Sequence, residues 1–524
     1  MIPALALFAL TYVLMLRLPQ ERPWVALCSA AVFIALGEVG IYDFSLGEAL
    51  RAVDYNVLLM MAGTMGTVSL FIESKMPARL AEMLIAKVPD VRWAVCALAL
   101  FAGFVSAFVD NVATVLMVAP VGLAIARKLK ISPVPVLIAI AVSSNLQGAA
   151  TLVGDTTSIL LGSFAEMNFF DFFWMRGRPG IFWGVELGAL ASMAVLLWLF
   201  RRETQPVTAK VETEAEDDVP AALMLLTVGL LIAASFLPQP GGGVLRALYE
   251  LRSGLVCMGL CLFGVVRACL RARSAKPLGR VVRELDRDTL LLLFGLFIVI
   301  AGVRAAGVID AAAALFHAIA GEDPFRLYLL LVAVSVVLSA FIDNIPYVAA
   351  MLPVVQGIAG LMNNGAGMEP YVFYFGLLTG ATLGGNLTPI GASANIAAIG
   401  ILRKNGEAVA TKDFLRIGVP FTLAAVLAGA AYLWLVWGRA WPAGTPWGHE
   451  NKKLPPAAGP GKPASRRAFS RKYDVLRKGK SFLQKMLDNS RISGIITIVP
   501  SDTAHEQNRI CGYGGIGRRV RFRF

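Results

Sequence analysis

The chain carries one motif twice, and the position of that motif limits the folds open to it. Residues 106–113 read SAFVDNVA and residues 339–346 read SAFIDNIP. Each copy places an Asp-Asn pair inside a long apolar stretch, and a Gly-rich segment follows about 40 residues later. A transporter that holds an ion and a solute midway through the bilayer needs polar, helix-breaking segments of this kind in each half.

Composition supports a membrane location for the chain. Hydrophobic residues make up 57% of the sequence and charged residues 16%, whereas soluble domains carry about 25% charged residues. The six cysteines include no Cys-x-x-Cys pair, and three scattered histidines do not suit a zinc or haem centre. We therefore expect a multi-pass protein of the cytoplasmic membrane. We expect it not to be an enzyme and to use no cofactor. Its coupling ion is expected to be Na⁺ or H⁺.

Eight apolar runs approach the length of ordinary membrane spans, which is about 20 residues. Two other segments, 93–127 and 327–360, are about 35 residues long with Asp-Asn near the midpoint, and a straight helix of that length would reach about 50 Å. Because the hydrocarbon core is only about 30 Å thick, we expect each to form a re-entrant helical hairpin that turns at Asp-Asn. The eight ordinary spans are 2–18, 24–41, 55–72, 181–200, 221–237, 251–270, 289–303 and 417–437.

Two segments of about 30 residues, 135–162 and 371–402, contain the Gly-rich interruptions. Non-helical backbone at membrane depth is tolerated where protein or a water-filled cavity covers it. We expect each segment to form a discontinuous helix, in which two half-helices are joined by an unwound loop. The predicted fold class is thus an all-α integral membrane protein with the architecture of an inverted-repeat secondary transporter.

The two halves of the chain align with each other. Residues 54–63 match 286–295 at a distance of 232 positions, and the Asp-Asn motifs match at 233 positions. The first half is expected to cross the membrane five times, so the second half starts on the opposite side and the repeat is inverted. The predicted domains are a first repeat at 1–200, a cytoplasmic linker at 201–219, a second repeat at 220–438 and a basic tail at 439–524.

Charge placement orients this arrangement. The first hairpin has basic residues at both ends, Arg92 and Arg127, which predicts the cytoplasmic side. The second hairpin has acidic and neutral flanks, which predicts the outer side. Residues 440–524 hold 17 Lys and Arg against 5 Asp and Glu and so carry +12 of the net charge of +13. We expect this tail to be disordered; contact with anionic lipid or nucleic acid is the alternative, and no nucleic acid is expected for the core.

The two motif aspartates, Asp110 and Asp343, have two interpretations. Each could cap the half-helix that follows it by accepting backbone N–H bonds, or each could bind a cation or a proton, and one carboxylate can do both. The neighbouring Asn111 and Asn344 can offer an amide oxygen to Na⁺ or an amide N–H to an anion. The positive N-termini of the half-helices favour an anionic solute.

The Gly-rich loops complete the predicted site. Asp155 belongs only to the first copy, because Ala392 stands at the matched position, and this asymmetry predicts an extra carboxylate at one cation site. Backbone carbonyls freed by the breaks suit a hard cation, so the predicted Na⁺ ligands are Asp110, Asn111, Gly154, Asp343, Asn344 and Gly391. The predicted ion-binding or substrate-binding loops contain Gly148, Thr151, Gly154, Gly385, Asn386, Thr388, Gly391, Ser393 and Asn395.

Residues 24–438 resemble the ion-transporter superfamily, which contains citrate and dicarboxylate transporters, NhaD-type sodium–proton antiporters, arsenite permeases and the P protein. The dicarboxylate branch has Ser-Asn-Thr at each hairpin tip, whereas this chain has Asp-Asn, which is more similar to the antiporters and the P protein. The segment 380–406, GATLGGNLTPIGASANIAAIGILRKNG, resembles the second-half loop of arsenite permeases. The resemblance implies a citrate transporter-like domain with paired cation sites at the tips, the solute between them, and elevator-type movement.

These observations predict a secondary active transporter that moves a small anion or metalloid oxyanion, either carboxylate or arsenite-like, with Na⁺ or H⁺. The main alternative is a Na⁺/H⁺ antiporter without an organic solute. A channel and an intramembrane aspartyl protease built on Gly154-Asp155 are remote alternatives, and the protease would leave Asp343 and the repeat unexplained. Expected partners are the small inorganic or organic anion and membrane lipid, and a homodimer remains open.

Overall fold

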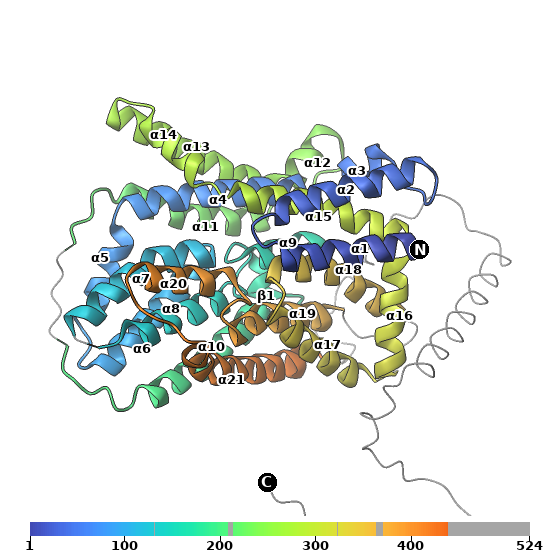
Figure 1. Ribbon diagram of the computed structural model, residues 1–524. Helices are drawn as coiled ribbons and strands as arrows, with labels where there is room; N and C mark the ends of the chain where they lie inside the picture. The colour runs from blue at the N-terminus through green and yellow to red at the C-terminus, as the bar shows by residue number, and fades with distance from the viewer. Residues whose placement is uncertain (130, 208–212, 322, 363–369, 439–524) are drawn as a thin grey trace, which may run out of the picture. The chain divides into compact units, whose positions relative to one another are not determined.

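The described part of the chain is helical almost throughout. The computed structural model describes residues 1–438 except 130, 208–212, 322 and 363–369 (Figure 1). The basic tail at 439–524 lies outside the described residues. The other regular elements are the 3₁₀ turns η1 (Phe170–Phe172) and η2 (Gly385–Leu387) and an antiparallel pair of strands, β1 (Trp174–Met175) and β2 (Arg178–Pro179).

The helices from the beginning of each repeat pack together in one layer, here called the N layer (Figure 1). Helix α4 packs on α13, and α2 packs on α15 in the matching way. Glycines allow this close approach, because a side chain at Gly63 or Gly295 would clash with the backbone of the facing helix. The N layer contains α1 (Ile2–Arg17), α2 (Arg22–Glu38), α3 (Leu46–Ala52), α4 (Tyr55–Glu73), α11 (Val219–Ser235), α12 (Gly243–Glu250), α13 (Arg252–Ala272), α14 (Lys276–Glu284) and α15 (Arg287–Ala305).

The helices from the end of each repeat form a second group, here called the C layer (Figure 1). In this group α8 packs on α6 and α7, α19 packs on α17 and α18, and α10 packs on α21. The C layer contains α6 (Val91–Ser106), α7 (Asn111–Lys128), α8 (Pro133–Gln147), α9 (Thr156–Phe164), α10 (Ile181–Leu199), α17 (Pro324–Ser339), α18 (Asn344–Met362), α19 (Tyr371–Gly384), α20 (Ser393–Lys404) and α21 (Thr411–Trp437).

Two short helices connect the layers. Helix α5 (Met76–Ile85) follows α4 and contacts α6 and α7, and α16 (Val308–Ala320) follows α15 and contacts α17 and α18. Figure 1 draws them at opposite ends of the two layers. Each repeat therefore passes from the N layer to the C layer through one short helix.

Helical breaks fall at the four polar interruptions. Helix α6 ends at Ser106, and the side chain of Asp110 caps α7, which begins at Asn111. Helix α17 ends at Ser339 and α18 begins at Asn344. The Gly-rich segments separate α8 from α9 and α19 from α20. The four breaks therefore bring together the ends of eight helices of the C layer.

A helix covers each of the eight apolar runs, and six helices of the described chain are long and apolar enough to cross a membrane. Five short helices, α3, α5, α12, α14 and α16, were not predicted from the sequence. These helices have 7 to 13 residues, which is too short to stand out among membrane spans. The paired strands β1 and β2 between α9 and α10 were also not predicted.

The linker between the repeats is attached to the C layer at its first end. The backbone N–H groups of Val91 and Arg92, at the start of α6, donate to the carbonyls of Gln205 and Glu203 at 3.0 and 2.9 Å. The backbone of residue 207 continues this pairing through a bond to the carbonyl of Pro89 at 3.3 Å.

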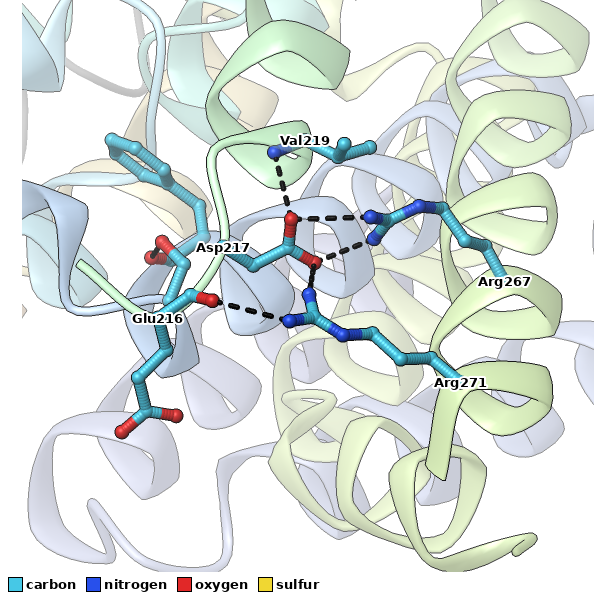
Figure 2. Close-up of polar contacts among 7 residues, drawn as sticks. Glu216, Asp217, Val219, Arg267 and Arg271 are labelled. Atoms are coloured by element: carbon cyan, nitrogen blue, oxygen red, sulfur yellow. Dashed lines mark hydrogen bonds and ion pairs between the residues drawn. The ribbon is translucent and has the colours of Figure 1, made fainter. Parts of the chain in front are cut away.

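The other end of the linker forms ion pairs with the N layer. Figure 2 shows Asp217 accepting two hydrogen bonds from Arg267, at 2.5 and 3.2 Å, with Arg271 at 2.8 Å from the same carboxylate. The hydrogen bond from Arg267 holds the pKa of Asp217 below its ordinary value. Lys75 pairs with Glu216 at 2.5 Å. Basic side chains of the N layer thus gather around the acidic linker.

Candidate functional site

A cavity between the two layers brings together residues from both repeats. Its volume is about 40 Å³, enough for about three waters, because one water needs roughly 10–15 Å³. It therefore suits an ion with part of its hydration shell. The lining residues are Met65, Asp110, Asn111, Val112, Asp155, Thr156, Asp286, Thr289, Asp343, Asn344, Ile345 and Ser393.

Asp110 lies at the turn between α6 and α7, here called the first tip. One carboxylate oxygen accepts the N–H groups of Val112 and Ala113 at 3.0 and 3.1 Å. This is the capping geometry expected for an Asp that begins a helix. The second oxygen has no hydrogen bond from a described residue, and no basic side chain of the described chain forms an ion pair with Asp110.

Asp155 reaches the same cavity from the start of α9. It is buried, with 4% of its surface exposed. It accepts bonds from the N–H of Thr156 at 2.7 Å and from the hydroxyl of Thr157 at 3.1 Å. No described basic residue pairs with it, so two carboxylates lack a positive partner: Asp110 in the turn and Asp155 beside it at the start of α9, both counted with the first tip from here on.

Asp343 lies at the turn between α17 and α18, here called the second tip, and its surroundings are different. Arg22, at the start of α2, places a guanidinium nitrogen 2.6 Å from the Asp343 carboxylate. The hydroxyl of Ser393 donates to the same oxygen at 3.3 Å. Arg22 was not predicted. It belongs to the N layer and Asp343 belongs to the C layer, so nothing near Asp343 in the sequence indicates the contact.

The motif asparagines of both tips converge on one residue, Asn145 of α8. Asn111 and Asn344 donate their amide N–H groups to the Asn145 side-chain oxygen at 2.9 and 3.3 Å. The Asn145 amide nitrogen donates in turn to the Thr382 carbonyl at 2.7 Å and to Asn386 at 3.1 Å. All four asparagines are buried. This network ties the tips and the second Gly-rich loop together beneath the cavity.

The first Gly-rich loop packs tightly against the first tip. A methyl group at Gly154 would lie 2.8 Å from the Gly148 carbonyl oxygen, 2.9 Å from that of Ala107 and 3.0 Å from that of Ser106. Thr151 donates its hydroxyl to the Ala107 carbonyl.

The second loop repeats this packing. A methyl group at Gly391 would lie 2.6 Å from the Gly385 carbonyl oxygen, 2.9 Å from that of Ala340 and 3.0 Å from that of Ser339. Thr388 donates its hydroxyl to the Ala340 carbonyl. Each loop therefore gathers three backbone oxygens, which are suitable ligands for a hard cation.

Four of these six carbonyls are less free than the sequence suggested, because those of Ala107 and Ala340 accept from the two threonines and two more accept from other side chains. Ser158 donates to the Gly148 carbonyl at 2.9 Å, and Asn395 donates to the Gly385 carbonyl at 3.0 Å. A carbonyl oxygen has two lone pairs, so one remains on each. The pairing of Ser158 with Asn395 between the copies follows from the sequence alignment, and each contacts the equivalent glycine.

Most predicted residues gather at the site. Asp110, Asn111, Asp155, Asp343, Asn344 and Ser393 line the cavity, and Gly148, Thr151, Gly154, Gly385, Asn386, Thr388, Gly391 and Asn395 lie in the supporting loops. The lining residues that were missed are Met65, Val112, Thr156, Asp286, Thr289 and Ile345, and the contacting residues Arg22 and Asn145 were missed as well.

Weak sequence signals existed for some of the missed residues. Asp286 precedes a helix start in a segment already aligned with Asp54, and its carboxylate accepts the N–H and the hydroxyl of Thr289 at 3.0 and 2.6 Å. Asn145 stands in the first Gly-rich segment, but the repeat gives it no asparagine partner. Within the described residues, no three His, Cys, Asp or Glu side chains are grouped closely enough to hold a metal ion, so carbonyl and amide oxygens would have to complete a cation shell.

The geometry defines a class of protein: an all-helical, multi-pass membrane transporter with a small polar site between two layers of helices. Over residues 12–375 the chain matches the family described as citrate transporter, CitMHS. The chain belongs to this family, which confirms the resemblance drawn from its motifs, and it is a transporter and not an enzyme.

Relatives extend the match across the membrane domain. The uncharacterized transporter Rv2685 of Mycobacterium tuberculosis is 31% identical over 441 residues, which cover 82% of this chain and 98% of the relative. The P protein of Homo sapiens is 26% identical over 498 residues, which cover 82% of this chain and 59% of that protein.

Two solved transporters have a similar fold. The Alcanivorax borkumensis YdaH transporter aligns with a TM-score of 0.54 at 15% identity, covering 80% of this chain and 98% of its own. Neisseria gonorrhoeae MtrF, described with a class of antimetabolite efflux pumps, aligns with a TM-score of 0.53 at 13% identity, covering 80% and 96%. At these identities the likeness concerns the fold alone.

Proposed function

We propose that this secondary transporter moves a small anion or metalloid oxyanion across the cytoplasmic membrane together with Na⁺ or H⁺. The observation that carries the proposal is the convergence of Asp110, Asp155 and Asp343, from three different helix starts, on one cavity that both repeats line. Asp155 and Asp343 are 4% and 9% exposed, and buried carboxylates are costly unless a positive charge or a proton compensates them.

The coupling cation is assigned first to the first tip. Asp110 and Asp155 lack a basic partner among the described residues, and the Gly154 region supplies backbone oxygens nearby. The second tip, with Asp343, Asn344 and Gly391, is the second candidate, although Arg22 already pairs with Asp343. An anion between the tips would face the N-termini of α7 and α18, whose dipoles attract negative charge.

Transport is proposed to proceed by movement of the C layer against the N layer. The cavity has walls from both layers, since Met65, Asp286 and Thr289 belong to the N layer and the other lining residues to the C layer. Helices α5 and α16 connect the layers within each repeat, and the linker connects them between the repeats. Sliding of the C layer would carry the tips and their ions across the membrane.

The function is tested by uptake into proteoliposomes. With an imposed inward Na⁺ or H⁺ gradient, we expect concentrative uptake of at least one solute among citrate, succinate, arsenite and sulfate. Uptake that merely equilibrates, and does not respond to either gradient, would contradict the proposal and indicate a channel.

Pure Na⁺/H⁺ antiport is the second candidate, because the cavity has room for about three waters and thus for an ion rather than a large solute. The same vesicles discriminate between the candidates. Na⁺-driven pH change in the absence of every panel solute, with no solute uptake, would establish antiport alone.

The proposed inverted topology makes a separate prediction. In single-cysteine variants, a membrane-impermeant maleimide added from outside should modify a cysteine at position 326 and spare one at position 127. Arg127 lies at the exposed end of the first predicted hairpin, and Arg326 is exposed near the start of the second. Modification of both positions from the same side would contradict opposed hairpins.

A further inference from the structure

The two tips carry different charges. At the first tip Asp110 and Asp155 bring two carboxylates without a basic partner among the described residues. At the second tip Ala392 replaces the second carboxylate, and Arg22 neutralises Asp343. Counting these groups, the first tip is formally −2 and the second formally 0; Asp286, exposed at the start of α15, adds a further carboxylate to the same cavity.

Arg22 is held firmly at the second tip. Its side chain is 19% exposed and that of Asp343 is 12% exposed, and they meet at 2.6 Å. The guanidinium also donates to the carbonyl of Met15, at the end of α1, at 3.3 Å. Tyr12 of α1 donates its hydroxyl to the carbonyl of Pro346 at 2.6 Å. Helices α1 and α2 thus contact the second tip at Asp343 and the first turn of α18 at Pro346.

Among the described residues, no arginine is paired with the first tip: Arg252, which begins α13 as Arg22 begins α2, donates instead to the carbonyl of Tyr249 at 2.9 Å. The matched glycines Gly63 and Gly295 fix the correspondence of the facing helices. Gly295 lies against Ala26 of α2 and Gly63 lies against Cys257 of α13. Residues of α2 therefore correspond to residues of α13 that are 231 positions further along the chain. That offset places Ser253 where α2 has Arg22. Within the described ranges, no hydrogen bond or ion pair joins α11 or α13 to the first tip.

The serines that precede the two tips also differ, because only the one before the second tip has hydrogen-bond partners. Ser339 donates to the side chain of Asn344 at 2.8 Å and to the carbonyl of Ala381 at 2.6 Å. The hydroxyl of its counterpart Ser106 is fully buried and has no hydrogen-bond partner. A buried polar group without a partner is expected to be satisfied by a bound species, so the Ser106 hydroxyl is available to a ligand at the first tip.

We propose that Arg22 takes the place of a coupling cation at the second tip, so that the transporter carries one cation per cycle, bound at the first tip. This inference rests on the proposed function. A guanidinium remains charged at any physiological pH and is suited to a buried carboxylate. Because Arg22 belongs to the N layer and Asp343 to the C layer, the pair compensates the Asp343 carboxylate in this conformation without a bound cation. Arg22 is thus a positioning residue that fixes the cation stoichiometry.

The variant Arg22→Gln tests this role. Without the guanidinium, Asp343 becomes a free carboxylate that recruits a second cation. We expect the Hill coefficient of uptake for the coupling ion to rise from about 1 toward 2, since it can reach the number of coupled sites. Arg22→Lys, which keeps the charge, should retain the wild-type value, and so should the double variant Arg22→Gln/Asp343→Asn, which removes the new site. Arg17→Gln, an exposed arginine at the end of α1, is the matched control.

The unmodified protein provides a test that does not depend on the folding of a variant. The reversal potential of wild-type uptake, measured with the solute that the panel identifies, should correspond to one cation per solute. Two or more cations, or a Hill coefficient unchanged by Arg22→Gln, would overturn the inference while the proposed function stands. A raised solute KM in Arg22→Gln with unchanged ion dependence would also overturn it, because Arg22 would then bind the anion. Absence of any ion-driven uptake in the wild type would contradict the proposed function itself.

Discussion

Asp110→Asn is expected to abolish the dependence of transport on the Na⁺ or H⁺ gradient while the protein still folds and inserts. Asn caps helices about as well as Asp, so the bonds to Val112 and Ala113 can be kept by the amide oxygen. The substitution removes the charge, which no described basic residue balances. Loss of one member of a buried charge pair costs about 2–5 kcal/mol, which is roughly a 30-fold or larger loss of cation affinity.

The measurement compares ion-driven uptake in vesicles that contain equal amounts of folded protein. Asp90→Asn is the matched control, because Asp90 caps the other end of α6 by accepting the N–H of Trp93 at 3.0 Å and does not line the cavity. We expect Asp155→Asn to resemble Asp110→Asn. Wild-type ion dependence in Asp110→Asn, Asp343→Asn and the double variant would leave capping as the sufficient role of both aspartates.

Much of the fold follows from local patterns that a sequence shows directly. Apolar runs of about 20 residues predict helices because a lipid environment leaves backbone groups no other partners. The breaks at Asp110 and at Asn344 coincide with polar and small residues inside apolar runs, where a helix loses its packing advantage. The repeat strengthens each prediction, because the same break occurs at matched positions in both halves, and chance agreement of that kind is rare.

The contacts that complete the site lack any local signal. Arg22 and Asp343 are 321 positions apart, and their pairing depends on how the N layer meets the C layer. Asn145 receives bonds from both tips, yet its matched position in the second half is Thr382, so the repeat did not single it out. The short connecting helices α5 and α16 are too short to resemble membrane spans.

The asymmetry between the tips was visible in the sequence only in part. Asp155 opposite Ala392 was apparent from the alignment of the loops. The complementary difference, Arg22 opposite Ser253, required the packing of α2 on α15 and of α13 on α4 to fix the alignment of those helices. A repeat therefore predicts which residues correspond only where the motif is strong, and tertiary contacts are needed elsewhere.

Gly154→Ala is expected to lower stability and eliminate ion-driven transport together. The added methyl group would meet the carbonyl oxygens of Gly148, Ala107 and Ser106 at 2.8–3.0 Å, and backbone atoms cannot move aside as a flexible side chain can. Overpacking of this kind typically costs about 1–3 kcal/mol. The displaced oxygens are those proposed to face the cation, so cation affinity should fall more than the loss of stability alone would explain.

Two further glycines make this test specific. Gly400→Ala is the control, because no atom lies near the added methyl group and the position is inside α20; we expect it to be neutral or to stabilise by about 0.5–1 kcal/mol. Gly391→Ala should destabilise about as much as Gly154→Ala, since it meets Gly385, Ala340 and Ser339 in the same way. With Arg22 serving as the positive charge at the second tip, Gly391→Ala should leave the residual transport as dependent on the ion as in the wild type. Equal loss of ion dependence in Gly154→Ala and Gly391→Ala, at equal thermal stability, would instead indicate that cations occupy both tips.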